Sequence, residues 1–214
     1  METQNPEGLA KSRGRGALTF LKELVETILI GAAVLLVLQA SVRNFRVVGS
    51  SMEPSLFTDQ RLLVNKIVYW HFPIGTLAQF IPFVRLDREA VFYPFHPPRR
   101  GEVVVFRFPK DPKVDFIKRI IATAGDTVAV REGVVYLNGQ PIEEPFVAHQ
   151  GYTDMAPIKV PNGSYFVMGD NRPSSNDSRD WGPVSAGYII GKAWFRYWPS
   201  SEMGLIGSAP VHAR

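Results

Sequence analysis

The sequence of 214 residues predicts a mainly β protein, in which one sheet-built or barrel-like domain follows a single N-terminal transmembrane α-helix. Two observations predict this fold. The 16 residues from Thr27 to Val42 carry no charge, as expected for a helix in lipid. After residue 43, short segments rich in Val, Ile, Phe and Tyr alternate with turn residues, which is typical of strands, and we recognise no amphipathic helix of any length there. The length suits one domain with appendages.

Several segments have the composition and alternation expected of β-strands. They are Arg61–Val68, Glu102–Phe108, Val114–Ala122, Thr127–Arg131, Val134–Leu137, Ser164–Met168 and Tyr188–Trp198. A further short apolar strand is expected to end at Gly49. Glu132-Gly133 and Asn138-Gly139 are turn signals, and the first pair is expected to join two short strands in a hairpin.

The N-terminal apolar segment is expected to be an uncleaved membrane anchor. The uncharged run alone spans about 24 Å as a helix, short of a hydrocarbon core of about 30 Å, whereas residues 17–42 are long enough. Four basic residues precede or enter it with no acidic residue between them, which favours a cytoplasmic N-terminus. They are Lys11, Arg13, Arg15 and Lys22. Arg43 and Arg46, on the other side, count against this orientation.

Two alternatives to the anchor stay open. A cleaved secretory signal has the same layout, although Leu38-Gln39-Ala40 places a large residue where cleavage needs a small one. A buried core helix is also compatible with so short an uncharged run. Both membrane-directed interpretations place the residues after 43 outside the cytoplasm.

The predicted organisation has four parts. They are a cytoplasmic tail (1–16), the anchor (17–42), an extracytoplasmic domain (43–200) and a C-terminal tail (201–214). Inside the domain, residues 70–98 are dense in aromatic residues and prolines. This segment is expected either to pack on its own domain as a loop or to contact the surface of the bilayer, where aromatic side chains are favoured.

Composition excludes several kinds of chemistry. Cysteine is absent, which removes thiol nucleophiles, disulfide scaffolds and Cys-ligated metals. The four histidines are widely spaced, so the catalytic base of any enzyme here need not be histidine. A net charge of +4 is too small and diffuse to indicate a nucleic-acid partner. Arginines interleave with the acidic residues of the most polar segment, so we predict no carboxylate metal site there. Separately, we expect no cofactor.

Lys118 is the first candidate for catalysis. In the strand predicted at Val114–Ala122, alternation places Lys118 on the same face as Val114, Phe116 and Ile120. Burial among apolar residues lowers the pKa of an ammonium group, and a neutral lysine can activate a hydroxyl nucleophile as a general base. The strand pattern alone favours instead an edge lysine whose stem packs while its head reaches water.

Two other segments supply hydroxyl groups. The segment Phe45–Leu56 (FRVVGSSMEPSL) places Ser50 and Ser51 in a turn after a glycine, where free backbone N–H groups can form an oxyanion hole. The segment Met168–Pro183 (MGDNRPSSNDSRDWGP) is densely polar, so it is either a solvated loop or a hydrogen-bonded platform beneath a site.

Taken in order, these segments resemble the type I signal peptidase family. The matching motifs are Ser51–Leu56 (SMEPSL, against the family's Ser-Met-x-Pro-Thr-Leu), Asp59–Lys66, Arg100–Pro112, Phe116–Asp126, Gly169–Trp181 and Ile190–Ala193. The resemblance extends from the anchor to about Pro199. The sequence departs from the family at Gly49, where some members have a serine whose hydroxyl helps the oxyanion hole, at Phe116 and at 122–124.

The resemblance implies roles for particular residues. Ser51 is the implied nucleophile and Lys118 the implied general base, with Ser175 orienting the lysine. Asp177 and Arg179 are the implied structural supports. The oxyanion hole would use the Ser51 backbone N–H, or the Ser50 side chain if it turns inward. The residues expected to contact the substrate are Val47, Val48, Gly49, Met52 and Ile117.

The implied activity is that of a membrane-bound serine endopeptidase that removes N-terminal signal peptides from exported precursor proteins. Its partners are these precursors and the lipid bilayer, in a plasma membrane or a thylakoid membrane. Two other functions are considered. One is a self-cleaving Ser–Lys regulator of the SOS-repressor type, against which the membrane span argues. The other is a membrane-tethered β-domain that binds peptides without cleaving them, in which Lys118 would be an ordinary exposed lysine.

Overall fold

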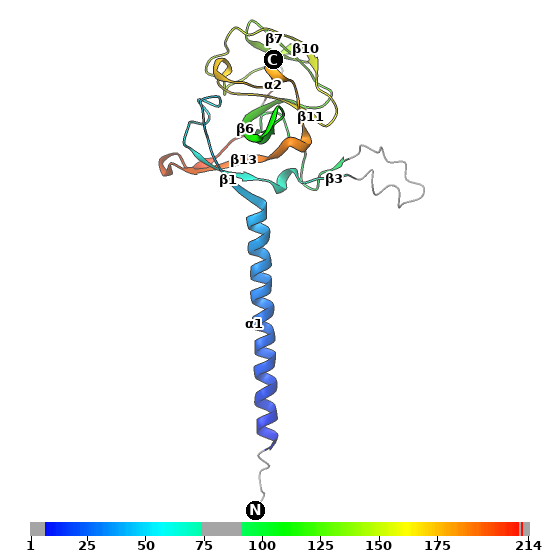
Figure 1. The fold of residues 1–214 in the computed structure, drawn as a ribbon, viewed down its shortest axis with the longest axis vertical. Coiled ribbons are helices and arrows are strands. Elements are labelled where there is room, and N and C mark those ends of the chain that lie inside the picture. The colour runs from blue at the N-terminus through cyan, green and yellow to red at the C-terminus, as the bar shows by residue number, and fades with distance from the viewer. Residues whose placement is uncertain (1–6, 74–90, 210, 212–214) are drawn as a thin grey trace, which may run out of the picture. The chain divides into compact units, whose positions relative to one another are not determined.

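The computed structural model describes residues 7–73, 91–209 and 211, and the chain divides into two compact units (Figure 1). The first unit is Met1–Ser41 and the second is Val42–Arg214. Most of the aromatic and proline-rich segment expected at 70–98 lies outside the described residues, namely its part from 74 to 90.

The first unit contains one long helix, α1 (Glu7–Ser41), which begins ahead of the anchor expected at residue 17. Its apolar part, Thr19–Ser41, has 23 residues and would span about 35 Å, enough to cross a membrane. None of its most apolar stretch is buried by protein. The alternative of a buried core helix is therefore wrong.

The second unit is mainly β, as predicted. Its larger sheet is antiparallel and has the strand order β1-β2-β13-β5-β6-β11-β12, with β14 paired to β13 (Figure 1). The strands are β1 (Val42–Arg46), β2 (Arg61–Asn65), β5 (Val103–Phe108), β6 (Asp111–Ala122), β11 (Ser164–Met168), β12 (Val184–Ser185), β13 (Ile189–Trp198) and β14 (Gly204–Leu205).

A second sheet has the order β10-β7-β8-β9 and lies at the far end of this unit from β1 and β13 (Figure 1). Its strands are β7 (Thr127–Arg131), β8 (Val134–Leu137), β9 (Gln140–Pro141) and β10 (Met155–Lys159). The hairpin predicted at Glu132-Gly133 joins β7 to β8, and both turn residues have positive φ. A two-stranded ribbon is formed by β3 (Phe72–Pro73) and β4 (Val91–Phe92).

Among the described residues of the second unit, helical structure consists of single turns. They are the 3-10 turns Ile67–Tyr69, Arg172–Ser174, Ala186–Tyr188 and Ser200–Glu202, and the four-residue helix α2 (Ser178–Trp181). The first of these ends the strand that was expected to reach Val68. It does so because the Asn65 side chain accepts hydrogen bonds from the N–H groups of Ile67 and Val68.

Two strand expectations need correction. The strand expected to end at Gly49 stops at Arg46, and Val47 continues only as a loop bonded to the backbone of Gln60. The strand β10 was not expected from the sequence. Pro157 lies inside it, removes a backbone donor and coincides with a shift of register against β7, so the strand pattern is weak there.

The core covers both faces of the larger sheet. Along β5, Val103 and Val105 belong to one buried cluster, whereas Val104 and Phe106 belong to another on the opposite face. A third cluster lies beneath the smaller sheet and includes Phe166 of β11, so the two sheets share a continuous apolar contact.

A buried ion pair also links the two sheets. Arg172 follows β11, and Glu144 follows β9 of the smaller sheet. The two terminal guanidinium nitrogens of Arg172 donate to the two carboxylate oxygens of Glu144, and each side chain is 1% exposed. The Arg172 Nε also donates to the carbonyl of Gly169 at 3.0 Å. This pair holds the loop after β11 against the smaller sheet.

Substituting Glu144→Ala should lower the free energy of unfolding by about 3–5 kcal/mol, because it leaves the buried Arg172 charge uncompensated. The matched control is Arg46→Ala, which breaks an ion pair whose side chains are 64% and 65% exposed and should cost no more than about 1 kcal/mol. Urea unfolding of the detergent-solubilised full chain, followed by tryptophan fluorescence, measures both. Equal losses for the two variants would contradict the role assigned to Glu144.

Candidate active site

Ser51 lies in the loop between β1 and β2. A backbone hydrogen bond from the Val47 N–H to the Gln60 carbonyl, 2.9 Å long, closes the base of this loop. Gly49 has φ +91°, a backbone conformation that residues with a side chain rarely adopt. Its carbonyl accepts a hydrogen bond from the Thr58 hydroxyl at 3.0 Å. These bonds turn the chain sharply just before Ser51 and fix the position of that residue.

Lys118 extends from β6 toward this loop. On the neighbouring strand β5, Val104 lies opposite Lys118 and Phe106 lies opposite Phe116. Lys118 therefore lies on the apolar face predicted from alternation. The side chain is buried, with 4% of the residue exposed, and Nζ lies 2.6 Å from the Ser51 hydroxyl oxygen. The structure thus joins two residues that are 67 positions apart in the sequence.

Burial lowers the pKa of Lys118 from its ordinary value of 10.5 to about 8. The negative charges of Asp177 and Asp170 raise this pKa, and the positive charge of Arg179 lowers it, but burial has the largest effect. Both carboxylates are already paired, Asp170 with Arg119 and Asp177 with Arg179. An appreciable fraction of Lys118 is therefore neutral near neutral pH.

The segment 169–182, which we call the polar loop, supports the site through Asp177. This carboxylate accepts the Gly169 N–H at 3.0 Å, caps α2 and forms the expected ion pair with Arg179, with Nε 2.8 Å from Oδ1. Arg179 in turn donates to the carbonyls of Arg172 and Ser175. The polar loop is the hydrogen-bonded platform that its composition suggested, rather than a solvated loop.

Ser175 lies beside the site but does not bond to Lys118. Its hydroxyl is buried and has no hydrogen-bond partner within the part of the chain that the structure describes. The polar loop passes very close to the nucleophile here, since a Cβ on Gly169 would lie 2.3 Å from the Ser175 hydroxyl and 2.4 Å from the Ser51 carbonyl oxygen. A side chain at position 169 would therefore displace both Ser175 and the backbone of Ser51.

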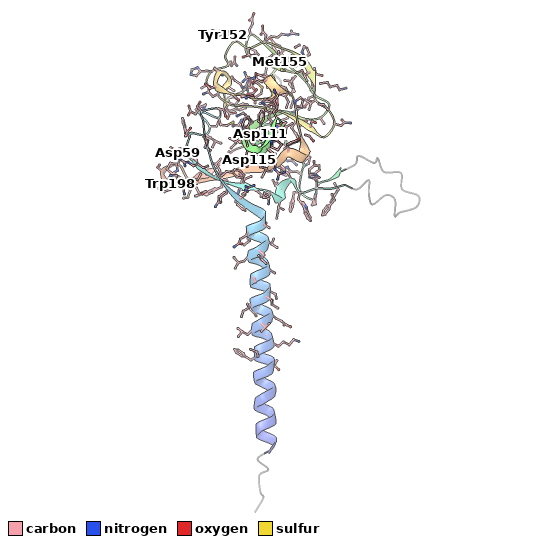
Figure 2. The ribbon with its side chains drawn as sticks, viewed as in Figure 1. Asp59, Asp111, Asp115, Tyr152, Met155 and Trp198 are labelled. Atoms are coloured by element: carbon pink, nitrogen blue, oxygen red, sulfur yellow. The ribbon has the colours of Figure 1, made fainter. Side chains whose placement is uncertain are left out.

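A cavity of about 560 Å³ opens in front of Ser51 and Lys118. Four of the five residues expected to contact substrate line it: Val47, Val48, Gly49 and Ile117. Met52 does not line the cavity, because this side chain is 1% exposed and packs in the core. The cavity is also lined by residues that sequence analysis did not select, among them Phe45, Leu62, Val105, Val114, Asp115, Phe116, Ser174 and Asn176. Figure 2 labels Asp115 on β6.

Asn171 is another residue that sequence analysis missed. Its backbone N–H donates to the Ser51 carbonyl at 3.0 Å, and its side-chain amide donates to the Ser50 carbonyl at 3.1 Å. Glu144, described above, was missed as well. Asn171 is far in sequence from Ser50 and Ser51, and Glu144 is far from Arg172. The density of polar residues around Asn171 was the one feature of the sequence that pointed to either residue.

The arrangement has the parts of a serine hydrolase that uses a lysine as its base. A hydroxyl lies within hydrogen-bond distance of an amine of lowered pKa, at the wall of an accessible cavity. The Ser51 N–H donates to no residue that the structure describes. Among residues 19–73, 92–209 and 211, no group of three or more His, Asp or Glu side chains could hold a metal ion.

Comparison with known proteins identifies the family. The profile of the family described as "Signal peptidase, peptidase S26" matches residues 21–198. "Probable signal peptidase I-1" of Synechocystis sp. is 36% identical over 197 residues, which cover 88% of each chain. "Signal peptidase I" of Leptolyngbya laminosa is 35% identical over 200 residues, or 90% of this chain and 87% of that protein.

A plant relative matches over a shorter region. "Thylakoidal processing peptidase 1, chloroplastic" of Arabidopsis thaliana is 40% identical over 129 residues, covering 56% of this chain and 38% of that protein. This chain belongs to the signal peptidase S26 family, and it is a serine peptidase. Its apolar helix and these relatives indicate association with a membrane.

Substituting Arg179→Ala should move the acidic limb of the pH–rate profile to higher pH. The variant removes a positive charge that lowers the pKa of Lys118 and leaves Asp177 unpaired, and both changes favour the protonated lysine. The loss of kcat/KM should therefore be larger at pH 7 than at pH 9, as measured by peptide cleavage across this range.

Arg179→Lys keeps the charge while losing the paired geometry, so it is the matched control and its limb should stay closer to that of the parent. An unchanged limb in Arg179→Ala, or one moved to lower pH, would contradict the electrostatic role of Arg179.

Proposed function

We propose that this protein is a membrane-bound endopeptidase that removes N-terminal signal peptides from exported precursors, with Ser51 as nucleophile and Lys118 as general base. The observation that carries the proposal is the 2.6 Å separation between the Ser51 hydroxyl and the Nζ of a buried lysine whose pKa is lowered to about 8. Neither the Ser51 hydroxyl nor the buried Lys118 amine would indicate catalysis alone. Together they form a nucleophile and its base at the wall of a cavity.

The reaction would begin with neutral Lys118. Its amine takes the Ser51 proton while the serine oxygen bonds to the scissile carbonyl carbon, and the carbonyl oxygen becomes an oxyanion held by the Ser51 N–H. As the oxyanion collapses, the C–N bond breaks and the ammonium of Lys118 gives its proton to the leaving amine. A water molecule, activated by the same lysine, then hydrolyses the acyl-enzyme and frees Ser51.

The edge of β6 suits an extended substrate. On one side, β5 pairs with β6 along most of its length, but on the other side β11 pairs only from Arg119 onward. The residues from Val114 to Lys118 therefore have, among the described residues, an edge with no strand partner at the cavity. A precursor segment would add there as a strand, beside Val47 and Ile117 of the cavity wall.

The membrane topology is also a proposal. The basic residues before the apolar helix support a cytoplasmic N-terminus and an extracytoplasmic catalytic domain, in a cell membrane or a thylakoid membrane. Around the ribbon of β3 and β4, several aromatic side chains are exposed, which supports contact of this region with lipid. They are Trp70, Phe72, Phe92 and Phe95.

The proposal is tested with the detergent-solubilised full chain and a precursor that carries an Ala-x-Ala site. Ser51→Ala and Lys118→Ala should each lower the cleavage rate by about 10⁴-fold or more, because nucleophile and base act as a unit. In the parent, kcat/KM should fall as the pH drops below about 8, since protonated Lys118 cannot accept the serine proton. Cleavage products are measured by gel electrophoresis and mass spectrometry.

The matched controls are Ser201→Ala and Lys110→Ala, which change exposed residues outside the cavity lining and should cleave like the parent. Cleavage by Ser51→Ala at the parent's rate would overturn the proposal. So would a parent that cleaves only its own chain, or that binds the precursor without cleaving it. An acidic limb below pH 5 would assign the base to a carboxylate instead of Lys118.

A further inference from the structure

The Ser51 backbone N–H is the backbone donor beside the nucleophile that is left for an oxyanion, since it donates to no residue in the described part of the chain. Gly49 carries no hydroxyl, and the neighbouring residue whose side-chain hydroxyl could assist is Ser50, which also lines the cavity. A backbone donor stabilises an oxyanion only where it is aimed at the developing charge. The orientation of the peptide between Ser50 and Ser51 therefore matters for the reaction.

That peptide is held by Asn171. The side-chain amide of Asn171 donates to the Ser50 carbonyl at 3.1 Å, and its backbone N–H donates to the Ser51 carbonyl at 3.0 Å. The Ser50 carbonyl also accepts the Glu53 N–H at 3.1 Å. One residue of the polar loop thus contacts the carbonyls on both sides of the nucleophile.

Because a peptide group is planar, the hydrogen bond from Asn171 to the Ser50 carbonyl also sets the direction of the Ser51 N–H. The bond between Ser50 and Ser51 is trans, so its C=O and N–H point in opposite directions in one plane. Fixing the Ser50 carbonyl toward Asn171 fixes the Ser51 N–H on the side away from Asn171. Rotation of this plane would turn the carbonyl toward the oxyanion position, and its partial negative charge would repel the oxyanion.

Asn171 is itself held from both sides. Its neighbour Asp170 forms a buried ion pair with Arg119, in which Nη2 lies 2.6 Å from Oδ2. Its other neighbour, Arg172, forms the buried pair with Glu144. A residue flanked by two buried ion pairs has little freedom to move. Its amide therefore holds the loop between β1 and β2, which carries Ser51, in a fixed position.

We propose that Asn171 is a positioning residue that orients the Ser51 N–H toward the oxyanion of the transition state. This inference rests on the proposed function. Asn171 acts through the peptide group and has no part in the proton transfer between Ser51 and Lys118. Its loss should therefore weaken binding of the tetrahedral state selectively, while substrate affinity and the acidic limb of the pH profile stay as they are.

The test compares the parent with Asn171→Ala in the detergent-solubilised full chain, using an Ala-x-Ala peptide and a peptide aldehyde that ends in alanine. When the aldehyde binds, the Ser51 oxygen bonds to its carbonyl carbon, the serine proton passes to Lys118, and the aldehyde oxygen becomes an oxyanion. Asn171→Ala should lower kcat by about 10–100-fold and raise the inhibition constant of the aldehyde by a similar factor. KM should change by no more than about twofold.

Asn162→Ala, which changes an exposed asparagine in a turn, is the matched control and should match the parent in every measurement. Loss of kcat with an unchanged aldehyde constant, a KM that rises as kcat falls, or a displaced acidic limb would each overturn the inference. A variant as active as the parent would overturn it too. If the parent itself neither cleaves the peptide nor binds the aldehyde, the proposed function fails first and takes the inference with it.

Discussion

The site depends on keeping the amine of Lys118 away from water while it touches the hydroxyl of Ser51. An ammonium group in an apolar environment is costly, and that cost is what lowers the pKa of Lys118 to about 8. The apolar face of β6, with Val104 opposite and Phe116 two residues away, provides this environment. The catalytic proposal therefore follows from ordinary sheet packing, in which a lysine occupies a position that the pattern would otherwise give to a hydrophobic residue.

Buried arginine–carboxylate pairs protect this arrangement. Asp170 and Asp177 are the carboxylates that raise the pKa of Lys118, and each is paired with its own arginine, which limits their hold on the lysine proton. The same pairs shape the polar loop and fix the close approach of Gly169 to Ser51. Charge balance and positioning are thus two effects of one set of contacts, and this is why a densely polar loop can lie beneath a site that needs an uncharged base.

Much of this could be predicted from the sequence, because alternation in strands has a period of two and marks faces directly. The strand around Lys118 was predicted on that basis and the turn before Ser51 from its glycine, and the family resemblance brought the two together. Glu144 was missed because nothing local connects it with a residue 28 positions away. Met52 was assigned to the substrate by its place beside Ser51, but the turn points it into the core.

The central claim is that Lys118 is neutral over an accessible range of pH because it is buried against Ser51. The most direct test is an NMR titration of the full chain in detergent micelles, in which the lysine side chains are isotopically labelled and Lys118 is assigned from the spectrum of Lys118→Arg. The account predicts that the Lys118 signal titrates with a midpoint near pH 8. A midpoint at the ordinary lysine value of 10.5 would contradict it.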